Sequence, residues 1–175
     1  MIIHNLITSR AVPEIITEHG GQPVRTRVGH SFIKARMAET GAVFGGEHSG
    51  HFYFRDFWFA DSGMLAALHV LAALGGQDAP LSQLLASYGR YVASGEINSA
   101  AADHRAATEA VRRAFADRPG VGMDDLDGLT VTCQDWWFNV RPSNTEPLLR
   151  LNVEASDEPT LAAIRDEVLH IVRGG

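Results

Sequence analysis

The sequence predicts an α/β chain, in which a partial α/β layered domain is followed by a small α+β domain with an antiparallel sheet and flanking helices. Two features of the 175 residues predict this arrangement. Strand-like and helix-like segments alternate in the first half, as in layered domains. Three strand-like runs follow one another in the second half and lead into a helix. The pattern changes near residue 94, so we expect domains at residues 1–94 and 95–175.

The elements of the first half follow from the period of the apolar residues. Runs of strand length or strand alternation occur at residues 2–7, 23–28, 42–44 and 52–54. Helical spacing ending at glycine predicts helices at residues 12–19, 30–40 and 62–74. A further helix after Pro80 is expected to turn four side chains inward, namely Leu81, Leu84, Leu85 and Tyr88.

The second half is expected to hold a helix at residues 105–115, a loop at 119–127 and strands at 129–133, 137–140 and 148–154. In the last strand apolar and polar residues alternate, which is typical of a half-buried strand. Asp157 is expected to cap a closing helix. That helix has an apolar stripe formed by Leu161, Ile164, Val168 and Ile171.

The start of the chain is unusual for a layered domain. A buried type of strand begins almost at once, and besides the aromatic run at 52–54 only three strand candidates precede the helix that begins at Ser62. Parallel sheets normally carry helices on both faces and protect their edges. We therefore expect either a compact variant or a domain whose first elements lie outside this chain. In the second case the open sheet edge is a candidate for pairing with another copy.

The composition narrows the functional classes. A hydrophobic fraction of 45% and a charged fraction of 21% are typical of globular proteins. The net charge of −6 argues against a general nucleic-acid or membrane-surface role. The single cysteine, Cys133, allows no internal disulfide and no cysteine-based zinc site. With no apolar run long enough for a bilayer and no signal-like N-terminus, a cytoplasmic location is expected.

The first candidate site is the segment Gly-Glu-His-Ser-Gly-His at residues 46–51. Its small residues let a ligand approach the backbone closely. The Glu47 carboxylate suits sugar hydroxyls, the Ser49 hydroxyl adds a donor, and the His51 imidazole suits proton transfer near neutral pH. Two alternatives remain open at this point. One is a metal site of Glu47, His48 and His51, which lacks the residue order of an HExxH site; the other is a simple polar turn.

The second candidate site is Arg-Pro-Ser-Asn-Thr-Glu-Pro at residues 141–147, between two predicted strands. Arg141 offers a planar fork to an oxyanion, and three short polar side chains follow it, namely Ser143, Asn144 and Thr145. The pattern favours a phosphate-binding loop, although it lacks the glycines and lysine of a P-loop. The alternative is a turn whose polar side chains bond their own backbone.

A third, weaker signal is His30 at a predicted helix start, where unpaired N–H groups favour anions. The neighbouring Ser31 is instead expected to act as a helix cap.

Three segments in this order resemble the C-terminal part of the α-D-phosphohexomutase family, which includes phosphomannomutases and phosphoglucomutases. They read VGHSFIK at residues 28–34, GEHSGH at 46–51 and RPSNTEP at 141–147. The resemblance extends over essentially the whole chain and implies the third domain of the family, without its beginning, followed by the complete fourth domain. Such enzymes interconvert hexose 1-phosphates and 6-phosphates through a bisphosphate, using a phosphoserine and Mg²⁺.

The resemblance also implies roles for individual residues. Glu47 and Ser49 would hold sugar hydroxyls, while His51 and His30 would be polar or acid–base contacts beside the substrate. The phosphate that is not transferred would be held by Arg141, Ser143, Asn144 and Thr145.

This chain departs from the family in what it lacks. It contains neither the family's phosphoserine segment nor its aspartate-rich metal segment, and Ile7 and Thr8 stand where many members have a basic residue. We therefore expect no metal ligands here, no turnover by the chain alone, and partnership with missing N-terminal domains or another copy. The alternatives are a stand-alone sugar-phosphate binding module and a metal-dependent hydrolase. The sequence does not distinguish mannose from glucose phosphates.

Overall fold

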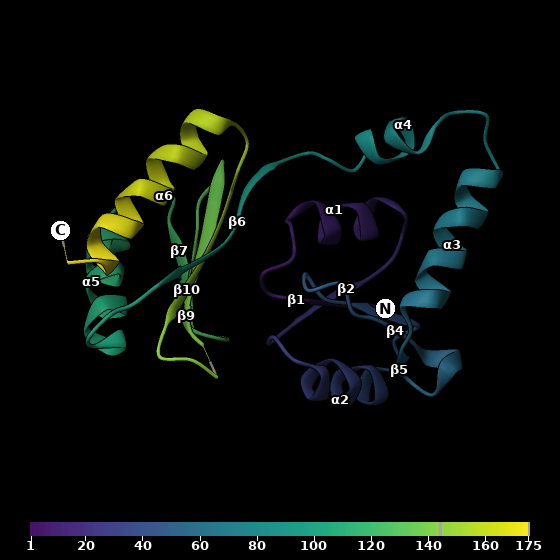
Figure 1. The fold of residues 1–175 in the computed structure, drawn as a ribbon, viewed down its shortest axis with the longest axis horizontal. Coiled ribbons are helices and arrows are strands. Elements are labelled where there is room, and N and C mark those ends of the chain that lie inside the picture. The colour runs from purple at the N-terminus through teal and green to yellow at the C-terminus, as the bar shows by residue number, and fades with distance from the viewer. Residues whose placement is uncertain (144, 175) are drawn as a thin grey trace. The chain divides into compact units, whose positions relative to one another are not determined.

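The computed structural model describes residues 1–143 and 145–174. The chain divides into two compact units, Met1–Arg90 and Tyr91–Gly175, and each contains one five-stranded sheet (Figure 1). The boundary expected at residue 94 falls inside strand β6 (Val92–Ser99), which belongs to the second sheet. The change of pattern near Ala93 therefore lies within a strand. Helices and a mixed sheet in the first unit, and an antiparallel sheet in the second, confirm the predicted fold class.

The first sheet has the strand order β2-β1-β3-β4-β5. The first three strands in space are parallel, and the last two run antiparallel to their neighbours. The strands are β1 (Ile2–Asn5), β2 (Pro23–Thr26), β3 (Phe44–Gly46), β4 (Phe52–Phe54) and β5 (Ala60–Asp61).

The strand order determines where the first two helices lie. Helix α1 (Ala11–Glu18) connects β1 to β2, and helix α2 (His30–Thr40) connects β2 back across β1 to β3. These two crossovers run in opposite directions along the sheet. Because parallel crossovers are right-handed, they place α1 and α2 on opposite faces of the sheet, as Figure 1 shows. The carboxyl ends of β2, β1 and β3 then meet at one edge.

The face of the sheet under α2 holds the core of the first unit. Its fully buried side chains are Ile3, Ile33, Met37, Ala42 and Tyr53. Strand β3 approaches α2 closely at Gly45, where a Cβ atom would lie 2.9 Å from the Met37 sulfur and 3.0 Å from the Ile33 Cγ2. Glycine at this position therefore lets the helix pack directly on the strand that leads into the 46–51 segment.

The other face of the sheet is covered less completely. Helix α3 (Gly63–Gly75) is capped by Ser62, whose hydroxyl accepts the Leu65 N–H, yet its apolar residues Leu68, Val70 and Leu71 are exposed. A short 3₁₀ turn (Arg55–Phe57) precedes it.

The expected inward packing after Pro80 is wrong. Helix α4 (Leu81–Ala86) leaves three of the four predicted core residues exposed, and Leu84 is half-buried. Apolar periodicity identifies the apolar face of a helix but not whether the same chain supplies a partner for it. The exposed residues are Leu81, Leu85 and Tyr88. The end of the unit is tied to α1 by Arg90, which forms ion pairs with Glu14 and Glu18.

The second sheet has the order β6-β10-β9-β8-β7 and is antiparallel throughout. Its other strands are β7 (Gly122–Asp124), β8 (Leu129–Thr132), β9 (Trp136–Pro142) and β10 (Leu149–Ala155). The sequence did not predict β6 or β7. Strand β6 is mostly polar and contains Gly95 at φ +67°, and β7 lies in the stretch expected to be a loop.

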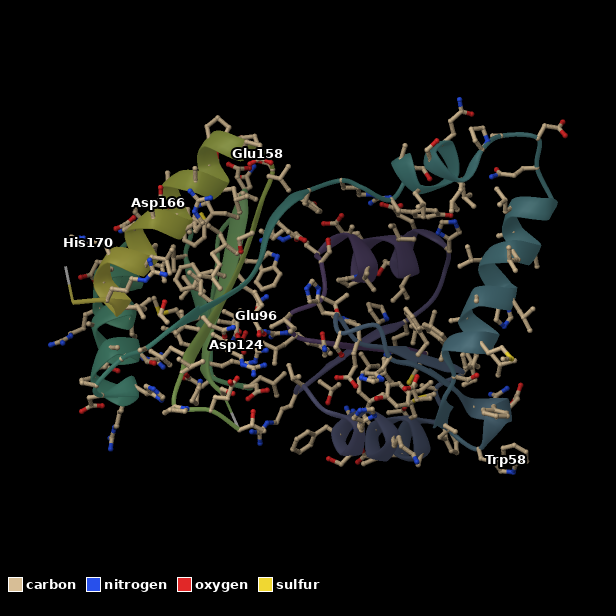
Figure 2. All side chains as sticks on the ribbon, viewed as in Figure 1. Trp58, Glu96, Asp124, Glu158, Asp166 and His170 are labelled. Atoms are coloured by element: carbon tan, nitrogen blue, oxygen red, sulfur yellow. The ribbon has the colours of Figure 1, made fainter. Side chains whose placement is uncertain are left out.

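Helices α5 (His104–Ala116) and α6 (Glu158–Val172) pack on one face of this sheet. The core between them contains Phe115, Phe138 and Val168, each fully buried. Asp157 caps α6 as predicted, because its carboxylate accepts the Thr160 N–H at 2.8 Å. The opposite face of the sheet is polar, and Glu96 lies on that side in Figure 2.

The close approach at Gly45 has a measurable consequence. We expect Gly45→Ala to destabilise the first unit by about 1–3 kcal/mol, the usual cost of overpacking a core. Gly46→Ala is the matched control, since the nearest atom to its Cβ would be 3.6 Å away. Chemical denaturation followed through Trp58 measures both variants, and equal stabilities would contradict the packing described here.

Candidate functional site

The carboxyl edge of the first sheet gathers the residues of two loops. Ile3 of β1 is in register with Val24 of β2 on one side and with Gly45 of β3 on the other. The three parallel strands therefore end at about the same level. His30 follows β2 and Glu47 follows β3, so two segments that are separate in sequence meet here. In open α/β sheets this edge, where the crossovers diverge, is where ligands bind.

Glu47 is buried at this edge, with 6% of its surface exposed. One carboxylate oxygen accepts the Gly29 N–H at 3.1 Å, and the other accepts the Tyr53 hydroxyl at 2.6 Å. A buried carboxylate needs such donors, because an unpaired charge away from water is costly. An ionised carboxylate offers about four acceptor positions, so two donors do not saturate it.

The Tyr53 hydroxyl connects Glu47 to His30. Its oxygen also lies 2.6 Å from His30 Nδ1. Tyrosine has a single hydroxyl proton, and here the hydroxyl donates it in the hydrogen bond to Glu47. The hydrogen bond with His30 therefore requires an Nδ1–H donor on the imidazole ring. In the neutral imidazole this leaves the lone pair on Nε2. Burial and the Glu47 carboxylate both raise the pKa of Tyr53, so the phenol keeps its proton.

His51 lies against His30, with ring centroids 4.3 Å apart. Its Nδ1 lies 2.6 Å from a carboxylate oxygen of Asp61 on β5, whose other oxygen accepts the Phe52 N–H. Partial burial acts to raise the pKa of Asp61, but the hydrogen bonds from His51 and Phe52 outweigh it and lower the pKa. The ionised Asp61 accepts a hydrogen bond from the Nδ1–H of His51, which leaves the Nε2 lone pair of this ring available as well.

The remaining residues of the 46–51 segment form an exposed turn. Ser49 and His48 are both exposed, and Gly50 adopts φ +83°, which closes the turn. Ser31 does not cap α2 as expected, because Gly29 is the capping position and no side chain bonds there. The structure thus brings together Glu47, His30 and His51, with Ser49 in the exposed part of the same turn.

In the second unit, Arg141 lies in strand β9 rather than in a loop, and its side chain is buried. One guanidinium nitrogen donates to the Asn152 side-chain oxygen at 3.1 Å, and another donates to Glu96 at 2.8 Å. Arg141 is therefore held rigidly on the polar face of the sheet.

Arg150 was missed by the sequence analysis and lies directly opposite Arg141, across the β9–β10 ladder. Like charges facing each other across a sheet repel. Glu96 reduces this repulsion, since its second oxygen lies 3.2 Å from Arg150. Two guanidiniums thus share the Glu96 carboxylate, and the exposed Glu146 contributes a weaker contact at 3.4 Å. The pair forms a positive site suited to an anion.

The signal for Arg150 was present in the sequence. It occupies an outward position of the alternating 148–154 run, next to the predicted phosphate segment. Glu96 carried no such signal, because β6 itself was not predicted.

The loop after Arg141 is short and polar. The Ser143 hydroxyl lies 3.4 Å from both the hydroxyl and the N–H of Thr145, and the Ser143 N–H donates to the Leu148 carbonyl. Asn144, the third predicted phosphate ligand, lies outside the described residues.

The structure suggests a different group for metal binding from the one weighed in the sequence. His30, His51 and Asp61 offer ligand atoms within 4.8 Å of one another. Glu47 instead bonds Tyr53 and Gly29. Two imidazoles and a single carboxylate do not fit Mg²⁺, which prefers oxygen ligands. The magnesium that the resemblance implies is therefore not assigned to this group.

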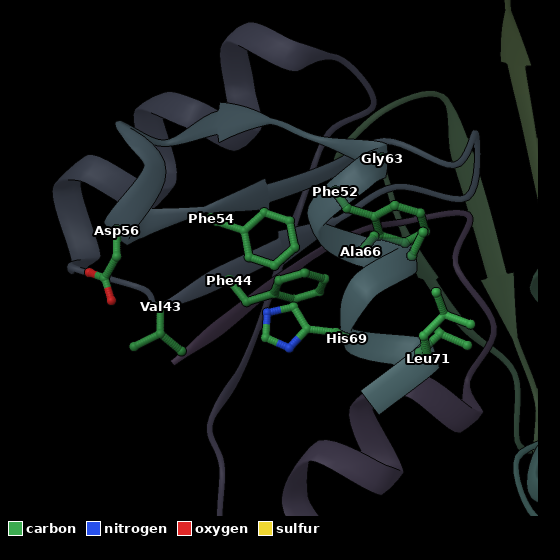
Figure 3. A pocket seen from close by; sticks show the side chains of 11 residues that line it. Val43, Phe44, Phe52, Phe54, Asp56, Gly63, Ala66, His69 and Leu71 are labelled. Carbon is green, nitrogen blue, oxygen red and sulfur yellow. The ribbon is translucent and has the colours of Figure 1, made fainter. Parts of the chain in front are cut away.

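An apolar hollow of about 1000 Å³ lies on the sheet face opposite Tyr53 (Figure 3). Phe44, Phe52 and Phe54 line one side, and α3 lines the other. His69 of α3 stacks on Phe54, with ring centroids 5.5 Å apart.

Comparisons with known proteins identify the chain's family. A family model described as phosphoglucomutase/phosphomannomutase, alpha/beta/alpha domain III, matches residues 1–91, and the C-terminal domain model of the same family matches residues 96–171. The chain belongs to the phosphoglucomutase/phosphomannomutase family. The resemblance predicted from the sequence is thereby confirmed.

Comparisons with individual relatives support the same family assignment. It is 42% identical over 171 residues to a phosphomannomutase of Methanocaldococcus jannaschii, covering 98% of this chain and 37% of the relative. A phosphoglucomutase/phosphomannomutase family structure from Burkholderia thailandensis superposes with a TM-score of 0.82 at 32% identity, covering 98% of this chain and 37% of the other. An Aspergillus fumigatus N-acetylphosphoglucosamine mutase, described in complex with GlcNAc-6P and magnesium, shares the fold at 13% identity and a TM-score of 0.69, with coverages of 98% and 41%.

The chain therefore spans little more than a third of the length of these relatives. None of its described helices has the length and apolar character needed to cross a membrane.

The position of Arg141 in β9 depends on Gly128, which lies in the loop between β7 and β8. At Gly128, φ +71°, a Cβ atom would lie 2.6 Å from Arg141 Cβ and 2.7 Å from its Cα. We expect Gly128→Ala to displace β9 and to destabilise the second unit by about 1–3 kcal/mol beyond its control. The control is Gly120→Ala, which has a similar φ of +76° but no atom closer than 3.8 Å.

Denaturation followed through the fluorescence of Trp136 and Trp137 compares the two variants. Since both impose the same left-handed backbone on alanine, the difference lies in the contacts with β9, at the Val140 carbonyl oxygen and at Arg141. Equal losses would show that Gly128 serves backbone conformation alone.

Proposed function

We propose that this chain supplies the sugar-recognition and phosphate-recognition loops of a phosphohexomutase. In the complete enzyme the reaction would interconvert a hexose 1-phosphate and a hexose 6-phosphate through a bisphosphate intermediate. The observation that carries the proposal is the Glu47–Tyr53–His30 constellation at the carboxyl edge of the first sheet, in a chain of this family.

The sugar is assigned to the 46–51 turn. Glu47 is fixed by two donors and retains acceptor capacity for a sugar hydroxyl, and the exposed Ser49 can donate or accept one hydrogen bond. His51 and His30 are assigned proton transfer to and from substrate oxygens. Their Nδ1 atoms are engaged by Asp61 and Tyr53, so Nε2 is the atom that exchanges the proton.

The phosphate that is not transferred is assigned to the second unit. Arg141 would hold it together with Ser143, Asn144 and Thr145, and Arg150 joins this set on the evidence of its pairing with Arg141. Glu96 already forms ion pairs with the guanidiniums of Arg141 and Arg150. An incoming phosphate therefore competes with the Glu96 carboxylate for their N–H groups. Charge-assisted hydrogen bonds of this kind contribute about 1.5–3 kcal/mol each.

The chemistry of phosphoryl transfer is assigned to sequence outside this chain, where the family resemblance implies the groups that carry it out. These are the phosphoserine and Mg²⁺, the latter by analogy with the fungal mutase described with magnesium. The complete enzyme is proposed to act in the cytoplasm.

The partner of the first unit is proposed to be the remaining polypeptide of a phosphohexomutase. The relatives are much longer than this chain, and the family models matched here are the third and C-terminal domains. The exposed apolar face of α3 and its adjoining hollow are the proposed contact surface. A second copy of the chain on this surface would appear as a dimer in light scattering and would contradict the assignment.

Binding of sugar phosphates by the chain alone tests the proposed function. With two or three charge-assisted bonds and the usual association cost, we expect a dissociation constant of about 1 mM or weaker, and no mutase turnover. Titration of ¹⁵N-labelled chain with mannose 1-phosphate or glucose 6-phosphate should shift amide signals in the 46–51 and 141–147 segments.

Two variants sharpen this experiment. Ser49→Ala should weaken the shifts at residues 46–51, whereas Ser82→Ala on the exposed surface of α4 should leave them unchanged. Absence of any shift in both segments at saturating ligand would overturn the proposal. Micromolar affinity would favour a stand-alone sugar-phosphate binding module.

A further inference from the structure

We propose that His30, His51 and Asp61 form a binding site for a first-row transition-metal ion such as Zn²⁺ or Co²⁺. Ligand atoms of these three residues lie within 4.8 Å of one another, and they come from three separate segments at one edge of the first sheet. The inference rests on this geometry alone and stands whether or not the chain takes part in a mutase.

One of the two imidazoles is already oriented as a metal ligand usually is. Histidines that bind metals generally donate their other ring N–H to a carboxylate or another oxygen, which fixes the tautomer. Here His30 Nδ1 is paired with the Tyr53 oxygen, so His30 offers its Nε2 lone pair. The partner of His51 Nδ1 is Asp61, itself a member of the site, so an ion held by both takes the place of the proton between them. The two ring centroids are only 4.3 Å apart.

The third member of the group is also held in place. Asp61 accepts the Phe52 N–H at 2.9 Å with the oxygen that does not bond His51. With metal–ligand bonds of about 2.0–2.1 Å, ligand atoms around one ion lie about 3.3 Å apart. The present spread is wider than this, but all three side chains are at least partly exposed and can close on an ion by small rotations.

The ligand types select the ion. Two imidazole nitrogens and one carboxylate oxygen suit Zn²⁺, Co²⁺ or Ni²⁺, whereas Mg²⁺ requires oxygen ligands in a strict octahedron. Three protein ligands leave at least one position open for water or a ligand oxygen. Because the ion would take up the Nε2 lone pair of His30 and shift the His51 proton from Nδ1 to Nε2, metal binding and proton transfer at those two Nε2 atoms exclude each other.

Titration of the 175-residue chain with Co²⁺ tests the site directly, since the visible absorption of the ion reports its ligands. We expect one equivalent to bind, with Zn²⁺ displacing it and millimolar Mg²⁺ leaving it in place. His30→Ala and His51→Ala should each weaken binding at least about tenfold, and Asp61→Asn should weaken it about 10–100-fold.

His48→Ala is the matched control, because His48 is an exposed imidazole in the same turn and should not affect binding. Equal affinity in the His30 and His51 variants, or an equal loss in the His48 variant, would overturn the proposal. Thermal melts verify that each variant folds. In the unsubstituted chain, paramagnetic broadening by Co²⁺ should centre on residues 30, 51 and 61, and broadening centred elsewhere would also overturn it.

Discussion

The hydrogen bond between the Tyr53 hydroxyl and the buried Glu47 carboxylate determines the arrangement of the first site. A carboxylate with so little exposure requires firm donors, and the structure supplies the phenol of β4 and the N–H that precedes α2. The direction of this bond then fixes the proton on His30. One buried negative charge thus links three segments, which the parallel register of β1, β2 and β3 has already brought to the same edge.

The second unit places positive charges, rather than a negative one, close together on its sheet. Arg141 and Arg150 face each other across neighbouring strands, and the repulsion between them is offset by Glu96 on the next strand. Such a cluster holds its guanidiniums rigidly but leaves them incompletely neutralised. An anion that replaces part of the Glu96 contact then finds the donors already positioned, which lowers the entropy lost on binding.

Much of this could be predicted from the sequence, because the 46–51 segment and His30 follow predicted strands of one parallel sheet. The closing helix and its Asp157 cap were predictable for the same local reasons. Other features depend on tertiary partners that no local pattern reveals. In the sequence Tyr53 is one of several neighbouring aromatic residues. Its role becomes visible only in the structure, where its hydroxyl donates to the buried Glu47 carboxylate. Glu96 was missed because β6 pairs only through contacts distant in sequence, and α4 was misjudged because its apolar face has no partner within the first unit.

Two carboxylates order the protons of this site: Glu47, through Tyr53, keeps the His30 proton on Nδ1, and Asp61 keeps the His51 proton on Nδ1. Long-range ¹H–¹⁵N correlation spectra of the histidine side chains measure this directly at a pH where the rings are neutral. We expect the Nδ1–H tautomer for both His30 and His51. Spectra showing the common Nε2–H tautomer for His30 would contradict it, because that ring would then have no proton to donate to the Tyr53 oxygen.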